Sequence, residues 1–138
     1  MTPVQITVVK ESFAKVVPIK ETAAEIFYNR LFELDPSLKE LFHTDMKEQG
    51  RKLMATLAVA VGGLDNLEAI LPVVRDLGSR HGGYGVEPSH YETVGTALIW
   101  TLEQGLGDDF TEQTKEAWVA AYGLLSSVMI EAGEGSAA

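Results

Sequence analysis

The chain has 138 residues, a length that suits one compact domain, and its 46% hydrophobic residues are enough to bury a substantial core. It contains no cysteine, which excludes disulfides, zinc ribbons and cysteine nucleophiles. The formal net charge of -9, with no basic patch and no apolar run of membrane-spanning length, argues against nucleic acid and membranes as partners.

Prolines that follow capping residues, together with pairs of glycines, divide the chain into segments of helical length. Thr2-Pro3 and Asp35-Pro36 each place a side-chain cap before a proline, which favours the start of a helix. Gly62-Gly63 and Gly82-Gly83 are expected to end helices, and no period-two pattern predicts a strand. The predicted helices cover residues 3–17, 20–34, 36–42, 47–61, 65–81, 88–105 and 112–132.

Two of these segments carry further expectations about where helices begin and end. Pro72 lies inside the segment 65–81, and because proline lacks a backbone N–H we expect it to begin a new helix there. Residues 133–138 are expected to form a short C-terminal tail after a single domain over residues 1–132. The predicted fold class is all-α.

A polar side chain that interrupts the apolar face of a helix marks a candidate functional position. His81 follows Val74 and Leu77 on one face, in the last turn of its helix. A half-buried histidine held by the helix dipole explains the same spacing. Because no second residue has metal-ligand spacing, a free-standing metal site is not expected. A cofactor that brings its own ligands would need only this one histidine.

Gln49 and two tyrosines also lie in line with apolar residues. Gln49 stands four residues before Leu53, Tyr28 three residues before Leu31, and Tyr91 three residues before Val94. From spacing alone, ordinary structural roles are the more common explanation of these patterns. A buried tyrosine can bond to a backbone carbonyl, and a first-turn glutamine can be partly solvated.

Taken together, three stretches of the sequence resemble the globin family. The second and third helices of a globin are matched by Tyr28-Asn29-Arg30-Leu31-Phe32 through Asp35-Pro36 to Leu41-Phe42. The proximal region of bacterial haemoglobins and flavohaemoglobins resembles residues 76–81 with 84–86 and 89–91. Their last helix resembles Ala117-Trp118 with Ala121-Tyr122-Gly123. The resemblance spans about residues 5–131 and implies a globin fold of six to eight helices packed around one haem.

The resemblance implies a cofactor, haem b (iron protoporphyrin IX), and roles for the matching residues. His81 matches the metal ligand on the proximal side, and Tyr28 and Gln49 match the polar distal positions over the open iron face. Tyr91 matches a tyrosine that hydrogen-bonds on the proximal side. The apolar stripes would sandwich the haem, and two cations would pair its propionates: Phe42, Leu53, Leu57, Leu77, Val86 and Val94, with Arg80 and Lys52.

The function implied by the resemblance is reversible oxygen binding of high affinity, because two hydrogen-bond donors face the ligand. Nitric oxide and carbon monoxide are the other expected ligands. The alternative is nitric oxide dioxygenase or peroxidase activity, for which an external reductase would supply electrons. The glutamate that completes the proximal network in flavohaemoglobins corresponds to Gly133, so a complete network is not expected. A haem-free globin-like module that binds partner proteins is a further alternative.

Location and assembly are the least specified by the sequence. The N-terminus lacks the basic and then apolar layout of a secretion signal, so a cytoplasmic location is the simplest expectation. Either a monomer or a homodimer is compatible with the sequence, and it also leaves open whether the protein is an enzyme.

Overall fold

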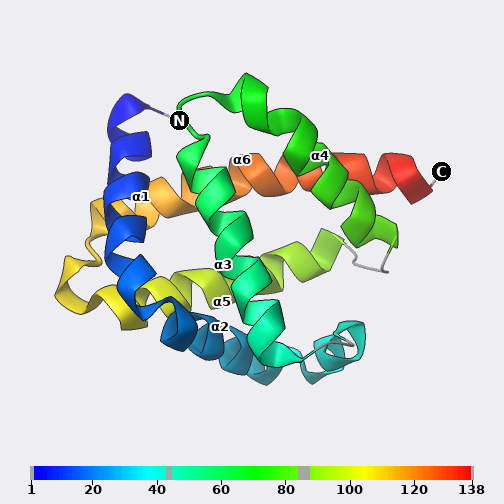
Figure 1. The fold of residues 1–138 in the computed structure, drawn as a ribbon, viewed down its shortest axis with the longest axis horizontal. Coiled ribbons are helices and arrows are strands. Elements are labelled where there is room, and N and C mark those ends of the chain that lie inside the picture. Colours follow the sequence, from blue (N-terminus) through cyan, green and yellow to red (C-terminus); the bar gives the residue numbers. More distant parts are fainter. Residues whose placement is uncertain (1, 43–44, 84–87, 138) are drawn as a thin grey trace.

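The computed structural model describes residues 2–42, 45–83 and 88–137, without the side chains of residues 81–83, 88 and 133–137. In these ranges the regular structure consists of α-helices and short 3-10 helices (Figure 1). The α-helices are α1 Pro3–Val16, α2 Lys20–Leu34, α3 Met46–Gly62, α4 Leu67–Gly83, α5 Pro88–Leu106 and α6 Glu112–Ala137. The 3-10 helices are η1 Val17–Ile19, η2 Pro36–Leu41 and η3 Gly107–Asp109. The predicted all-α fold class is therefore confirmed.

The predicted caps explain why the first helices begin where they do. The Thr2 hydroxyl accepts a hydrogen bond from the Gln5 N–H at 3.1 Å, and the Gln5 side chain accepts one from the Thr2 N–H at 3.0 Å. This reciprocal capping box satisfies two backbone donors that the helix itself leaves free. The carboxylate of Asp35 accepts a hydrogen bond from the backbone N–H of Ser37 and so starts η2 in the same way.

The prediction that Pro72 begins a new helix is wrong, because Pro72 lies inside the continuous helix α4. The backbone hydrogen bond that proline cannot make is the one to the carbonyl of Glu68. Both residues are exposed, so water can hydrate that carbonyl. At the other end of the chain, α6 extends to Ala137, beyond the predicted end near Ala132.

The helices pack in pairs around a core to which α1, α2, α3, α5 and α6 contribute. In Figure 1, α6 runs behind the other helices, and it packs against both α1 and α4, while α2 packs against α5 and α3. Trp118 of α6 is buried, and its indole N–H donates to the Ser12 hydroxyl of α1 at 2.8 Å. On the surface, the guanidinium of Arg30 lies 4.3 Å from the ring centroid of Trp100, joining α2 to α5.

Helices α2 and α3 cross closely at a glycine. A Cβ atom added to Gly50 would lie 2.9 Å from the Cβ of Ala24, which is too short for two carbon atoms. The glycine therefore allows the two backbones to approach more closely than any other residue would. This crossing matters for the site, because Gln49 precedes Gly50 and Tyr28 follows Ala24 by one helical turn.

We expect Gly50→Val to lower the free energy of unfolding by roughly 1–3 kcal/mol, because the added methyl groups force α2 and α3 apart. The matched control is Gly62→Val in the same helix, where an added Cβ would meet no atom within 4 Å. Urea denaturation followed by circular dichroism measures both variants. Equal losses in the two variants would show that the crossing is not tightly packed.

Candidate functional site

Tyr28 and Gln49, both singled out in the sequence, face each other across the α2–α3 crossing. The phenol of Tyr28 is buried and shares a hydrogen bond with the side chain of Gln49. Burial raises the pKa of Tyr28 to about 12, although the hydrogen bond with Gln49 acts in the opposite direction. The hydroxyl of Tyr28 therefore keeps its proton, and its capacity to donate a hydrogen bond, throughout the neutral and mildly alkaline range.

An aromatic cluster holds the ring of Tyr28 in place. Its centroid lies 5.0 Å from that of Phe27 and 5.5 Å from that of Phe42, both in edge-on geometry, and 6.1 Å from that of Phe32. Phe42 was predicted to be part of the site, but Phe27 and Phe32 were not. The spacing of four residues between Tyr28 and Phe32, which places them on one helix face, is the signal that could have found Phe32.

Most of the predicted apolar lining lies at the margin of the core. Phe42, Leu53, Leu57 and Val94 pack against buried residues while each keeps part of its own surface exposed. Leu77 of α4 is also only partly buried. These side chains therefore offer apolar surface that the protein itself does not cover.

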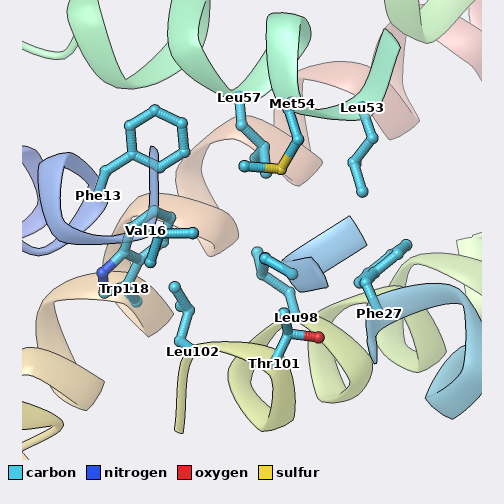
Figure 2. Close-up of a pocket in the computed structure, with 11 residues that line it drawn as sticks. Phe13, Val16, Phe27, Leu53, Met54, Leu57, Leu98, Thr101, Leu102 and Trp118 are labelled. Atoms are coloured by element: carbon cyan, nitrogen blue, oxygen red, sulfur yellow. The ribbon is translucent and has the colours of Figure 1, made fainter. Parts of the chain in front are cut away.

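The core directly behind this lining is almost filled. Figure 2 shows Leu53, Met54 and Leu57 pointing from α3 toward Leu98 of α5 and Phe27 of α2. The apolar cavity that remains among them has a volume of about 10 Å³, which is close to that of one water-sized sphere. Because so little free space remains behind them, the side chains of Leu53 and Leu57 have little room to move inward.

The predicted face of α4 points inward as far as its side chains are described. Ile70 and Val74 are buried and Leu77 is partly buried. His81 belongs to the same helix, four residues after Leu77, but its side chain lies outside the described part of the structure. Val86 lies outside it as well. The roles assigned to these two residues remain predictions.

The predicted proximal tyrosine, Tyr91, lies in the first turn of α5, and its backbone is hydrogen-bonded to α6. The hydroxyl of Tyr122 donates a hydrogen bond to the backbone carbonyl of Tyr91 at 2.6 Å. Gly95 makes room for the Tyr122 ring, since a Cβ there would lie 2.8 Å from the ring. Burial raises the pKa of the Tyr91 phenol, which is half-buried. The surroundings of Gly133 lie outside the described region, so the expected gap in the proximal network remains a prediction.

The two cations expected to pair with the haem propionates are both exposed. Arg80 forms an ion pair with Asp76, one turn earlier in α4, with 2.9 Å between its nitrogen and the carboxylate oxygen. Exposed pairs of this kind contribute little free energy, so Arg80 can exchange this partner for another anion at small cost. Lys52 lies on the exposed side of α3. Their contact with propionates remains a prediction.

The buried tyrosines predict a loss of stability at alkaline pH. Burial raises the pKa of both Tyr28 and Tyr122 in the folded state, so the native protein holds these protons more tightly than the unfolded chain does. Stability should be unaffected below pH 10 and should fall as the pH rises from 10 through 12. For Tyr28 alone the expected loss is about 2–3 kcal/mol.

Urea denaturation at a series of pH values measures this loss, and Tyr28→Phe is the variant that separates the contribution of Tyr28. The variant should lose less stability than the unsubstituted protein between pH 10 and 12. Identical pH profiles would show that Tyr28 does not titrate with a raised pKa.

The described residues fit the haem that the resemblance implies. Uncovered apolar surface on Phe42 and Leu53 flanks the hydrogen-bonded pair of Tyr28 and Gln49, so a flat apolar group with a polar ligand on one face has matching partners.

Within the described ranges, no group of three or more His, Asp or Glu residues is placed to hold a metal ion. No described helix is both long and apolar enough to cross a membrane.

Comparison with known proteins agrees with this architecture. The family model for globins matches residues 25–129. A flavohemoprotein of Vibrio cholerae is 32% identical over 138 residues, covering 95% of this chain and 34% of the relative. A flavohemoprotein of Halalkalibacterium halodurans is 35% identical over 114 residues, covering 80% of this chain and 28% of the relative. The chain thus spans about a third of the length of these curated relatives.

Solved structures lead to the same family. A bacterial globin from Campylobacter jejuni is 26% identical with a TM-score of 0.85, and 97% of each chain is covered. An engineered carbene transferase, derived from a putative nitric oxide dioxygenase of Rhodothermus marinus, is 25% identical with a TM-score of 0.86, covering 99% of this chain and 94% of that one. With a family model that matches most of its length and relatives more than 30% identical, this chain belongs to the globin family.

Proposed function

We propose that the protein is a haem b protein that binds oxygen reversibly and tightly. In this proposal His81 would hold the haem iron, and Tyr28 and Gln49 would donate hydrogen bonds to the gas that the iron binds. The observation that carries the proposal is the hydrogen bond between Tyr28 and Gln49 beside the uncovered apolar surface of Phe42 and Leu53.

When bound, a ferrous haem supplies an open coordination position for small diatomic gases. The chain's own residues determine which gas is held well. Tyr28 offers one O–H donor that stays protonated, and the amide of Gln49 offers two N–H donors, so Gln49 can bond to Tyr28 and still reach a ligand. Each hydrogen bond in such a dry pocket is worth about 1–3 kcal/mol, or roughly ten- to a hundredfold in affinity.

The apolar walls supply the remaining binding energy and keep water out. Phe42, Leu53, Leu57 and Val94 would lose their exposed surface to the haem. At about 25 cal/mol for each Å² of buried apolar area, this contact contributes several kcal/mol to retention of the haem.

Absorption spectroscopy of the purified protein, reconstituted with haemin, tests this function. We expect a Soret band that shifts on reduction and shifts again, reversibly, when oxygen is added and removed. A colourless protein that takes up no haemin would contradict the proposal and would favour the haem-free module that binds partner proteins.

Nitric oxide dioxygenase activity is the second candidate function. It is favoured by the name of the Rhodothermus marinus protein and by the flavohemoprotein relatives, whose chains are about three times longer. The reaction joins nitric oxide and oxygen and consumes one electron to give nitrate, so sustained turnover needs a reductase. Multiple turnovers with an added flavin-dependent reductase and a nicotinamide donor would support this function, whereas a single turnover would support oxygen binding.

A further inference from the structure

The helix that carries His81 is held in place mainly by α6. Figure 1 shows α4 lying across the C-terminal half of α6, and this is the most extensive helix contact of α4, which touches α3 only slightly. The distance between α4 and α6 therefore determines where the last turn of α4 stands relative to the rest of the molecule.

A glycine sets this distance. Gly78 is buried at the crossing, and a Cβ atom added to it would overlap the backbone of Met129 in α6. That atom would lie 2.5 Å from the Cα and 2.8 Å from the carbonyl carbon of Met129, and closer still to the carbonyl oxygen. Backbone atoms within a helix cannot rotate out of the way as a side chain can. Any residue larger than glycine therefore pushes the two helices apart.

The next residue adds a second attachment to α6. The hydroxyl of Ser79 donates a hydrogen bond to the backbone carbonyl of Ala132, with 3.4 Å between the two oxygens. His81 follows Gly78 by three residues, which corresponds to about 4.5 Å along the helix axis. The two attachments thus lie within one turn of the backbone of His81, and a displacement at Gly78 is passed directly to it.

We propose that Gly78 is a positioning residue that seats α4 on the backbone of α6 and so fixes the place of His81. The inference rests on the proposed function, in which His81 holds the haem. It adds that the strength of the bond between His81 and the iron depends on the contact between Gly78 and the backbone of Met129 in α6.

The test compares Gly78→Ala with the matched control Gly123→Ala in haem-loaded protein. Gly123 is a helical glycine of α6 where an added Cβ would meet no atom within 4 Å. We expect Gly78→Ala to shift the iron–histidine stretching band in the resonance Raman spectrum and to speed haem loss about tenfold. Gly123→Ala should leave both unchanged.

Two further measurements add separate readouts: Ser79→Ala does not require the Gly78 variant to fold, and amide hydrogen exchange does not require haem. Ser79→Ala removes only the bond to Ala132 and should speed haem loss about two- to fivefold. Hydrogen exchange of the α4 amides after residue 74 should be about tenfold faster in Gly78→Ala than in Gly123→Ala.

The outcomes separate the inference from the function on which it rests. If the unsubstituted protein binds no haem, the proposed function fails and the inference falls with it. If it binds haem, and Gly78→Ala keeps the same Raman band, haem-loss rate and amide exchange, the inference alone is overturned.

Discussion

Replacement of His81 by alanine is expected to abolish stable retention of haem. The proposal gives the iron this residue as its only protein ligand, and apolar contacts with Phe42 and Leu53 alone leave the group free to exchange. We expect transfer of haem to an excess of a haem-accepting protein to become faster by on the order of 100-fold or more. The fall in Soret absorbance with time measures the rate.

Two further histidine variants make this result specific. His90→Ala, in the first turns of α5, should retain haem as the unsubstituted protein does. His81→Gly should lose haem as His81→Ala does, but recover its Soret band when free imidazole is supplied to fill the space. An alanine variant at position 81 that holds haem normally would place the ligand elsewhere in the chain.

Tyr28→Phe is expected to speed oxygen dissociation about 10- to 100-fold while carbon monoxide dissociation changes less than about threefold. The substitution removes only the hydroxyl, because the ring stays fixed by Phe27, Phe32 and Phe42. Oxygen becomes the more polar of the two gases on binding and gains more from a hydrogen-bond donor. Stopped-flow displacement measures both rates, with carbon monoxide serving as the control for changes in pocket shape.

Gln49→Leu, alone and combined with Tyr28→Phe, shows whether the two donors act as a unit. Because their side chains share a hydrogen bond, we expect the effect of the double variant on oxygen dissociation to differ from the sum of the single effects. Strictly additive effects would mean that each donor reaches the ligand independently. Unchanged rates in all three variants would remove the distal role from both residues.

The helices were predictable where local chemistry alone decides their limits. α2 has the predicted bounds, since a turn containing Pro18 precedes it and Asp35-Pro36 follows it. Pro72 was mispredicted because its tolerance inside α4 depends on whether the carbonyl of Glu68 faces water. That condition is set by tertiary packing. The end of α6 was underestimated because Gly133 and Gly135 are poor helix formers, yet the helix continues to Ala137.

The site was predictable to the extent that it depends on helix faces. Tyr28 and Gln49 each interrupt an apolar face, but the bond between them depends on how closely α2 and α3 cross at Gly50. Phe27 and Phe32 were missed because an aromatic residue on a helix resembles ordinary core until its neighbours are known. The sequence shows that residue 78 is a glycine but does not reveal that it faces the backbone of Met129.

The two tryptophans of the chain stand in contrasting surroundings, and this gives the protein an optical readout of its own. Trp118 is 3% exposed and bonded to Ser12, whereas Trp100 is 38% exposed beneath the guanidinium of Arg30. In the haem-free protein, iodide in the surrounding water can quench the fluorescence of Trp100 but cannot reach the buried Trp118. The fluorescence that remains comes from Trp118 and reports on the core where α1 meets α6. Loosening of that core can therefore be followed without attaching a dye.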